Sequence, residues 1–275
     1  MEKEKTPHLV LAHAIAERYG KVPEVEAVVL AGSLTSGVAD RGSDIDLYVY
    51  TRAEIPLEAR TNIAKANSEY AEVNNQFWEP GDEWIDTVTG IHVDVMFRSV
   101  DWIEKQLNRI LKRHEASVGY STCFWHNVIL SQALYDRSGW YRKLQQEARQ
   151  PYPEALKRAI IAKNHPILRQ TVSSYMNQLK KAVARNDWIS INHRVAALLA
   201  SYFDILFAVN KIPHPGEKRL AEIAIKLCKE TPPGMEQQLN DLMHVISKGD
   251  RVIEIAETLI GGLDILLRSE ESNSK

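Results

Sequence analysis

Two aspartates at the start of a hydrophobic segment constrain the fold of this chain most. Residues 43–50 read SDIDLYVY, and they follow the apolar residues 28–31 and the pair Gly32 and Ser33. Successive side chains of a strand point to opposite faces, so Asp44 and Asp46 share one face while the apolar residues between and after them face a core. Two carboxylates on one face repel each other unless a cation compensates them. A hard divalent cation, usually magnesium, is the natural compensation.

A third acid lies in residues 90–97, which read GIHVDVMF. The alternation of apolar and polar residues predicts a half-buried strand with Asp94 and His92 on its polar face. A glycine turn at residues 89–90 predicts a hairpin with a preceding strand over residues 77–88. Either acidic motif alone is typical of a solvated strand edge. Their coincidence with the Gly-Ser turn, the spacing and the apolar flanks indicates a site.

The hydrophobic periodicity changes along the chain. The first part predicts helices over residues 7–19, 33–38 and 54–72, and strands over 25–31, 77–88 and 91–97. After residue 99 the spacing predicts helices only, near residues 100–113, 124–133, 139–150, 153–184, 189–209, 215–229, 235–246 and 250–267. The pattern breaks at residues 136–139 and 151–153. We therefore expect a catalytic domain over residues 1–140, a helical bundle over 141–268 and a disordered tail over 269–275.

Composition narrows the class of protein. The chain has 275 residues, with 34 Lys and Arg against 36 Asp and Glu, which gives a formal net charge of -2. This balance does not favour a nucleic acid as the main partner. The two cysteines, Cys123 and Cys228, have no zinc or disulfide spacing, so a reducing cytoplasm is expected. The charged N-terminus is unlike a signal peptide, and no apolar run is long enough for a membrane span.

The order of five residues resembles the motif of the nucleotidyltransferase superfamily related to DNA polymerase beta. Its motif is Gly-Ser, a gap of about this length, Asp-x-Asp or Asp-x-Glu, and a third acid on a later strand, and these places are filled by Gly32, Ser33, Asp44, Asp46 and Asp94. Within the superfamily, the chain is similar to bacterial antibiotic nucleotidyltransferases, such as those that modify aminoglycosides and lincosamides. The resemblance implies an α+β fold: an N-terminal nucleotidyltransferase domain with a mixed β-sheet and flanking helices, followed by a C-terminal α-helical bundle.

The resemblance also implies a chemistry. A hydroxyl of the acceptor attacks the α-phosphorus of a nucleoside triphosphate, ATP or another, and pyrophosphate leaves. Asp44, Asp46 and Asp94 would be the catalytic acids and would hold magnesium, with two ions expected. Asp94 is either a metal ligand or the base that takes the hydroxyl proton, and the sequence leaves both roles open. Ser33 as a covalent nucleophile is not favoured, because no Gly-x-Ser-x-Gly elbow surrounds it.

The phosphates would meet several further residues. Gly32 allows close backbone approach, and Ser33 and Ser43 offer donors. Kanamycin-type enzymes carry an arginine three residues after the motif serine, where this chain has Ser36, so we expect Arg41 to supply that charge. In the second half, residues 202–220 resemble a block in the helical domain of such enzymes. There Lys218 or Arg219 would face the triphosphate, or both would stay solvated. Kanamycin-type enzymes also use a glutamate of the helical domain as base, and this resemblance offers Glu115, Glu147 and Glu154 as alternative candidates.

The expected function is therefore magnesium-dependent transfer of a nucleoside monophosphate, AMP from ATP, to a hydroxyl of a small molecule such as an aminoglycoside-like or lincosamide-like antibiotic. One alternative is a non-catalytic nucleotidyltransferase-like regulatory or antitoxin module, and another is transfer to RNA or protein. Retention of all three acids argues against the first alternative, and the charge balance argues against RNA. The expected protein is a monomer or a homodimer.

Overall fold

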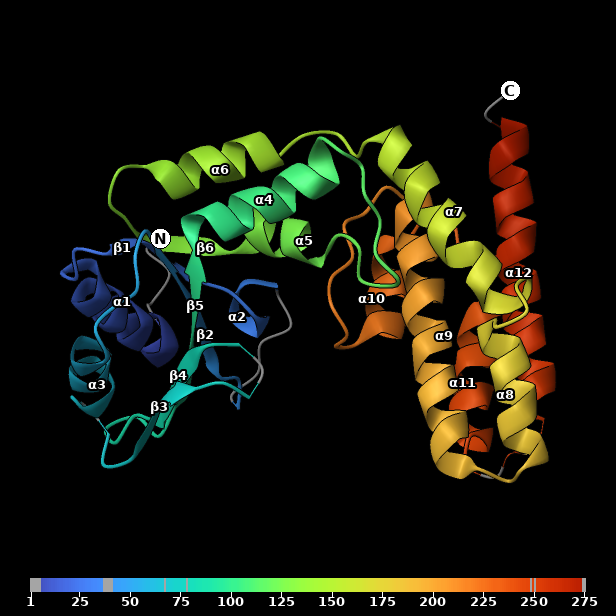
Figure 1. Ribbon diagram of the computed structural model, residues 1–275, viewed down its shortest axis with the longest axis horizontal. Helices are drawn as coiled ribbons and strands as arrows, with labels where there is room; N and C mark the ends of the chain where they lie inside the picture. Colours follow the sequence, from blue (N-terminus) through green and yellow to red (C-terminus); the bar gives the residue numbers. More distant parts are fainter. Residues whose placement is uncertain are drawn as a thin grey trace. The chain divides into compact units, whose positions relative to one another are not determined.

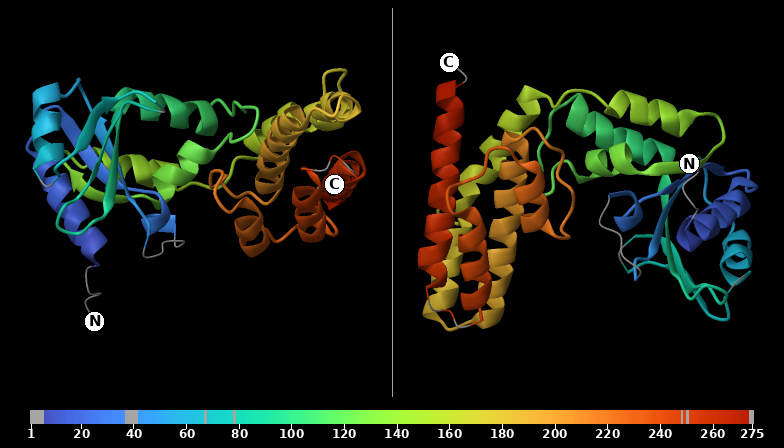
Figure 2. Two further views of the ribbon diagram at one scale, coloured as in Figure 1. Left: turned by 90° about the horizontal axis from the view of Figure 1, so that it is seen from below. Right: turned by 180° about the vertical axis from the view of Figure 1, so that it is seen from behind.

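The structure is a computed structural model that describes residues 6–36, 42–66, 68–77, 79–247, 249 and 251–273. Its internal contacts divide the chain into two compact units (Figures 1 and 2). Unit 1 consists of Met1–Asn108 and Asn127–Gln150, and unit 2 consists of Arg109–His126 and Pro151–Lys275. The chain therefore leaves unit 1 at residue 109, returns to it at residue 127 and leaves it again at residue 151.

Unit 1 is built on a mixed sheet. Its strands are β1 (Val25–Leu30), β2 (Ile45–Thr51), β3 (Ala71–Asn75), β4 (Gly81–Ile85), β5 (His92–Ser99) and β6 (Gln132–Asp136). In the described part of the chain they form one six-stranded sheet with the order β3-β4-β5-β2-β1-β6 (Figure 1). β2 and β5 run parallel, and the other neighbours run antiparallel. The helices with residues in this unit are α1 (Pro7–Gly20), α2 (Ser33–Ser36), α3 (Leu57–Lys65), α4 (Val100–Leu111), α5 (Cys123–Leu130) and α6 (Trp140–Ala148).

One face of the sheet packs against α1 and α3. Alternate strand residues, among them Leu47 on β2 and Val95 on β5, share a buried cluster with Ile15 and Tyr19 of α1. Full burial of one such aliphatic side chain stabilises the fold by about 1.5–3 kcal/mol. α1 begins with Pro7, which suits a first helical turn because the nitrogen there needs no intrahelical partner. The apolar face of the two central strands is thereby fixed toward α1.

A buried ion pair joins α3 to β4 on the same face. Arg60 donates from Nε and Nη2 to the Asp82 carboxylate at 3.0 and 2.6 Å. Arg60 is 6% exposed and Asp82 is 0% exposed. The Asn74 N–H also donates to Asp82 at 2.8 Å, and the guanidinium lies 4.1 Å from the centroid of the Phe97 ring. Loss of either charge would leave the other buried and uncompensated.

The opposite face of the sheet has two parts. Toward the end of β2, the buried Tyr50 ring stacks on Tyr141 of α6 at 5.4 Å and meets Trp140 edge-on at 5.5 Å. Burial raises the pKa of Tyr50 to about 12, so this phenol stays neutral. Toward the start of β2 and β5, the same face carries carboxylates instead of aromatic rings. The register of the two strands therefore places the acids beyond the part that α6 contacts.

Unit 2 is helical. Its helices, besides parts of α4 and α5, are α7 (Glu154–Arg169), α8 (Tyr175–Ala184), α9 (Trp188–Val209), α10 (Leu220–Leu227), α11 (Met235–Val245) and α12 (Val252–Asn273). α9 supplies much of the core, and every residue of its second half, 201–209, is buried. No helix in the described part of either unit is long and apolar enough to cross a bilayer.

The segment Arg109–His126 is bound to unit 2 by buried polar contacts. The N–H and Oγ of Ser121 donate to the Asp204 carboxylate of α9 at 2.9 and 2.6 Å. Asn164 of α7 accepts from the Gly119 N–H at 2.9 Å and donates to Asp204 at 3.2 Å. Burial raises the pKa of Asp204 to about 6, although the Ser121 and Asn164 hydrogen bonds favour its ionised form. This segment thus joins two helices that follow it in the sequence.

The α+β prediction is confirmed, with differences in detail. Residues 71–75 form β3, not the end of a helix over 54–72, because they pair with β4. Residues 132–136 form β6, although no strand was expected after residue 99, because β1 offers them an antiparallel edge. The helix expected over residues 153–184 is two helices, and the Ser174 side chain caps the second. α12 reaches Asn273 and so includes most of the tail that was expected to be disordered; Lys157 of α7 pairs with Glu270 at 2.6 Å in this last part.

Candidate active site

Three carboxylates form a row across neighbouring strands. Asp46 on β2 is the direct register partner of Asp94 on β5, and Asp94 is the direct partner of Glu83 on β4. Paired residues of neighbouring strands project from the same face of a sheet. Asp44 lies two residues before Asp46, and its Oδ1 is 3.5 Å from Nδ1 of His92. The structure therefore brings Asp46 and Asp94 together, as the sequence predicted, with Asp44 at the edge of the row.

Gly32 fits closely against the first member of the row. Its φ of +65° is a conformation that side chains rarely adopt, and a Cβ at this position would overlap the Asp46 carboxylate. The neighbouring Ala31 N–H donates to the Asp46 carbonyl at 2.9 Å, which fixes the turn beside β2. Thr35 donates from Oγ1 to the Gly32 carbonyl at 3.2 Å and closes the turn from its other side. Only glycine meets both requirements here, the left-handed backbone and the missing side chain.

The row is electrostatically unfavourable for Asp94. The pKa of Asp94 is raised to about 6, first by burial and then by the negative charges of Glu83 and Asp46; His92 opposes this rise. A bound cation would reverse the effect, because opposite charge favours the ionised carboxyl. The site therefore has the excess negative charge that a divalent cation compensates.

Glu83 was not among the predicted catalytic, metal or phosphate-binding residues, although the sequence of residues 78–86 predicts either a patch for a cationic amino sugar or a solvated hairpin. Its Oε1 accepts from Asn75 Nδ2 of β3 at 2.8 Å, and its Oε2 lies 3.9 Å from His92 Nε2. The only sign of Glu83 as a site residue in the sequence was the acid-rich segment of residues 79–86, before the hairpin turn. The partner of Glu83 depends on the register of β4 with β5, which cannot be read from alternation alone. Glu83 and Asn75 are thus residues that only the structure assigns to this face.

The comparison with known families decides the class of this domain. Residues 11–116 match the model of the nucleotidyltransferase domain family. The chain contains a nucleotidyltransferase domain. All the carboxylates of the row, and Gly32 with them, lie within the matched residues. The prediction that the chain is an enzyme of the nucleotidyltransferase class is confirmed, whereas the match says nothing of the antibiotic-modifying branch.

Solved structures with similarity to the chain carry related descriptions at low TM-scores. A nucleotidyltransferase-like protein from Exiguobacterium sibiricum has a TM-score of 0.45 and 15% identity over 94% of this chain and 74% of its own. A Thermotoga maritima CCA-adding enzyme complexed with tRNA has a TM-score of 0.37 and 15% identity, over 98% of this chain and 70% of its own. A STING-associated CdnE c-di-GMP synthase from Capnocytophaga granulosa has a TM-score of 0.28 and 10% identity, over 96% of this chain and 80% of its own. No curated protein sequence matches the chain.

The other predicted site residues of the nucleotidyltransferase domain lie on the turns around the row. Ser33 is the first residue of α2, directly after Gly32. Ser43 lies just before β2, and its carbonyl oxygen is 3.1 Å from His8 Nε2. Arg41 lies outside the described residues. The phosphate-binding roles of these residues remain predictions.

The predicted residues of the second half are solvent-exposed. Lys218 lies in unit 2, just before Arg219, which caps the start of α10 with a φ of 55°. Of the alternative bases, Glu147 lies in unit 1, and Glu115 and Glu154 lie in unit 2. Each of these three glutamates is exposed. Nothing in their surroundings distinguishes one of them as a base, and that assignment also remains a prediction.

The donor atoms fit a hard cation without forming a closed metal cage. Among the described residues, no group of three or more His, Cys, Asp and Glu side chains is arranged to hold a metal ion. Magnesium keeps several waters and is usually bound by one or two carboxylates together with substrate phosphates. Asp46 and Asp94, paired across β2 and β5, supply that kind of half-site. The chemistry of these donors therefore fits a cation that arrives with a nucleotide.

Proposed function

We propose that the nucleotidyltransferase domain transfers a nucleoside monophosphate, AMP from ATP, to a hydroxyl of a small molecule such as an aminoglycoside-like or lincosamide-like antibiotic, with release of pyrophosphate. One observation carries the proposal: Asp46 and Asp94 are direct cross-strand partners, and Gly32 leaves room for the Asp46 carboxylate. Nucleotidyl transfer needs oxygen ligands for a divalent ion beside a turn that admits phosphate closely.

Each acid has a distinct part in this proposal. Asp44, Asp46 and Asp94 bind the divalent ion, which when bound neutralises charge on the phosphate oxygens. The turn at Gly32 leaves the space that the Asp46 carboxylate occupies. As the alternative to its role as a ligand, Asp94 is the base that accepts the proton of the attacking hydroxyl, since a pKa of about 6 leaves its carboxyl mostly ionised at neutral pH. Ser33 and Ser43 donate hydrogen bonds to the triphosphate from the turns on each side.

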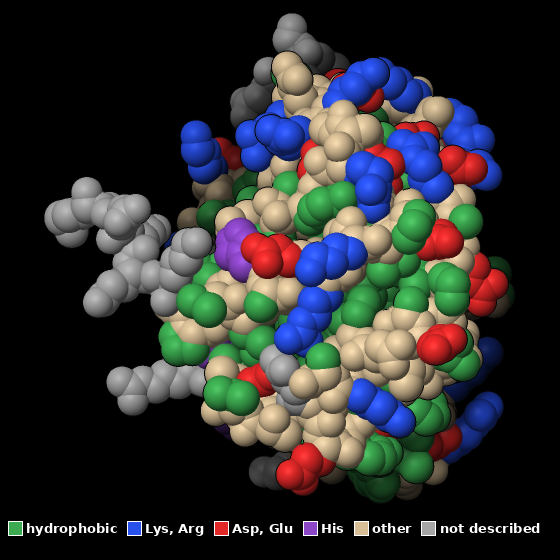
Figure 3. Space-filling model, turned by 90° about the vertical axis from the view of Figure 1, so that its left-hand side faces the viewer, with side chains coloured by type: hydrophobic (Ala, Val, Ile, Leu, Met, Phe, Trp, Pro, Cys, Tyr) green, Lys and Arg blue, Asp and Glu red, His purple; other side chains and the backbone are tan. Residues whose placement is uncertain are grey.

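Charge supports a small acceptor over a polynucleotide. A protein that binds a nucleic-acid backbone concentrates Lys and Arg on one surface. The formal net charge of this chain is -2. On the face shown in Figure 3, Asp and Glu side chains lie among the Lys and Arg side chains that gather near its upper edge. An acceptor with amino groups suits the acidic row, since Glu83 adds a carboxylate beside the proposed metal ligands.

The proposal is tested by pyrophosphate release with ATP, magnesium and a panel of aminoglycosides and lincosamides. We expect release that depends on both metal and acceptor, and loss of at least a hundredfold in Asp46→Asn, because the amide carries no charge for the ion. Asp101→Asn, on the exposed first turn of α4, is the matched control and should keep full turnover.

Two results would contradict the proposal in different ways. Undiminished turnover in Asp46→Asn would remove its metal role. Tight binding of another macromolecule by a protein that shows no turnover with any acceptor would favour a regulatory module. Mass spectrometry of the reaction products would show which molecule carries the added adenylyl group, and so would distinguish a small-molecule acceptor from RNA or protein.

A further inference from the structure

Unit 2 holds a large open cavity that the proposed reaction does not use. Its volume is about 900 Å³, and it is lined by residues of α7 and α12. Sites for small organic ligands have volumes of roughly 300–1,000 Å³ and combine an apolar wall with a few polar groups. Ile161 and Ala162 of α7 and Leu267 of α12 provide an apolar wall here. The cavity therefore has the size and the lining of a ligand site.

Side-chain contacts bridge α7 and α12 at two places along this cavity. Lys157 Nζ lies 2.6 Å from Glu270 Oε2, and His165 Nε2 lies 2.6 Å from Asp264 Oδ1. Lys157 and His165 are eight residues apart on α7, which is about 12 Å along a helix. The space between the bridges is thus as long as a small organic molecule.

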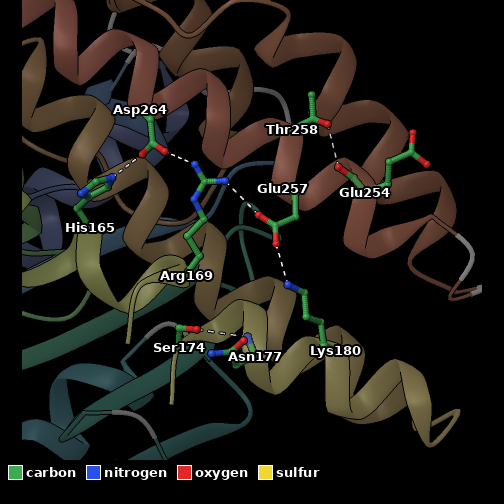
Figure 4. Close-up of polar contacts among 9 residues, drawn as sticks. All are labelled: His165, Arg169, Ser174, Asn177, Lys180, Glu254, Glu257, Thr258 and Asp264. Carbon is green, nitrogen blue, oxygen red and sulfur yellow. Dashed lines mark hydrogen bonds and ion pairs between the residues drawn. The ribbon is translucent and has the colours of Figure 1, made fainter. Parts of the chain in front are cut away.

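The second bridge belongs to a longer chain of polar contacts (Figure 4). Asp264 also pairs with Arg169, whose Nη1 donates to Glu257 at 3.0 Å. Glu257 in turn accepts from Lys180 of α8 at 2.9 Å. These contacts hold α7, α8 and α12 together beside the cavity, and they give Asp264 two partners, the Arg169 guanidinium and the His165 ring.

Each acid that lines the cavity has a cationic partner, whereas the two arginines of the lining have none among the described residues. Glu154 lies 3.3 Å from Lys211 and so has a cationic partner of its own, as Asp264 and Glu270 do. Arg158 of α7 and Arg268 of α12 line the cavity from its two walls and are exposed. Neither forms an ion pair with any other residue that the structure describes. Among the described side chains, the positive charge of these two arginines therefore has no ion-pair partner at this cavity.

We propose that the cavity between α7 and α12 binds a small organic anion, with a carboxylate or phosphate group between Arg158 and Arg268 and an apolar body against Ile161 and Leu267. A guanidinium presents donors in a planar fork that matches both kinds of anion, and its charge strengthens each hydrogen bond. The apolar wall supplies the remaining contact. This site is separate from the carboxylate row and holds whether or not that row transfers nucleotides.

The test compares three probes that share one ring system: 1-naphthyl phosphate, 1-naphthaleneacetate and uncharged 1-naphthol. Binding to the full-length protein without magnesium is measured by titration calorimetry. We expect at least one of the anions to bind with one saturable site at this cavity, and at least tenfold more tightly than 1-naphthol. The affinities of the two anions, compared with each other, show whether the site prefers a phosphate or a carboxylate.

Two double variants locate the site. Arg158→Gln with Arg268→Gln should weaken anion binding at least tenfold and leave 1-naphthol unchanged. Lys181→Gln with Arg185→Gln removes two exposed cations of α8 and the loop after it, outside the cavity, and should leave anion binding unchanged. All four side chains are exposed, so circular dichroism should show intact folding. Equal anion affinity in the two double variants, or no saturable binding of either anion, would overturn the proposal.

Discussion

At the scale of single residues, the contact between Gly32 and Asp46 makes the sharpest prediction. Gly32→Ala should lower turnover on the order of a hundredfold or more, because the new methyl group displaces the Asp46 carboxylate, and displacement of a reacting group by about 1 Å has effects of this size. Turnover and circular dichroism of the purified variant are the measurements.

Gly90→Ala is the matched control for this variant. Gly90 has a φ of +70°, close to the +65° of Gly32, but no other atom lies within 4 Å of an added Cβ. Both variants carry a similar backbone strain, so the difference in turnover isolates the contact with Asp46. Equal turnover in the two variants would show that the carboxylate position is unimportant.

Asp94 supplies a second prediction at this scale. In metal-free protein its carboxyl should titrate near pH 6, and addition of magnesium should lower this pKa, because a bound cation favours the ionised form. Glu83→Gln should lower the pKa as well, since it removes a negative neighbour. Carbon NMR of labelled aspartate follows the titration directly.

The control for the Asp94 titration is Glu58→Gln. Glu58 is an exposed residue of the first turn of α3, so its removal should leave the titration of Asp94 unchanged. A carboxyl of Asp94 that titrates at the same pH with and without magnesium would argue against its role as a metal ligand.

The same residues mark how far the sequence alone reaches at the site. Asp46 and Asp94 were predicted to share one site because the residues around each aspartate alternate between apolar and polar, and because their order resembles the superfamily motif. Glu83 lies on a strand of five residues whose register is set by the hairpin loop. A slip of one residue would have turned Glu83 to the opposite face. Long-range register, which leaves no local signal, was the missing information.

At the scale of the elements, the buried pair of Arg60 and Asp82 fastens α3 to β4. Arg60→Ala should destabilise unit 1 by about 3–5 kcal/mol, because Asp82 is left buried without its cation. Unfolding in urea followed by tryptophan fluorescence measures the change.

An exposed ion pair serves as the control for Arg60→Ala. Arg251→Ala removes an exposed partner of Glu254 at the start of α12 and should cause no resolvable change. A similar effect of both substitutions would mean that burial does not set the strength of the α3–β4 pair.

The observed boundaries of helices and strands agree with the predicted ones where the hydrophobic period is clear. They differ where pairing with a strand distant in the sequence determines the structure. α1 and α9 match their expected ranges within a few residues, because their apolar faces repeat over several turns. β6 was missed because its partner β1 is about a hundred residues earlier in the chain. β3 was missed for a related reason, since its residues continue a helical pattern until β4 pairs with them. Tertiary pairing overrode local preference in both cases.

At the scale of the whole molecule, Asp204 makes the stability of unit 2 depend on pH. The pKa of the Asp204 carboxyl is about 6 in the folded protein, whereas its ordinary value, which applies to the unfolded chain, is 3.8. Between about pH 4 and pH 6 the folded unit therefore binds a proton that the unfolded chain has released. Stability from this group is therefore greatest below pH 4 and falls as pH rises to 6. Asp204→Asn should flatten this dependence.

Urea unfolding at several pH values, followed by the helical signal in circular dichroism, tests this prediction. Asp241→Asn, at an exposed acid of α11, should leave the profile as in the parent protein. If the stability of unit 2 in Asp204→Asn still falls as steeply between pH 4 and 6, another group is responsible for the dependence.

The path of the chain has a consequence for its synthesis. A nascent chain that emerges from the ribosome cannot finish the sheet when β5 has appeared, because β6 and α6 arrive only after residues 109–126 have passed. Those residues must then wait for Asn164 and Asp204, which are translated later. The polypeptide thus exposes an unfinished sheet edge and an unanchored loop at the same time, the kind of intermediate that molecular chaperones shield during translation.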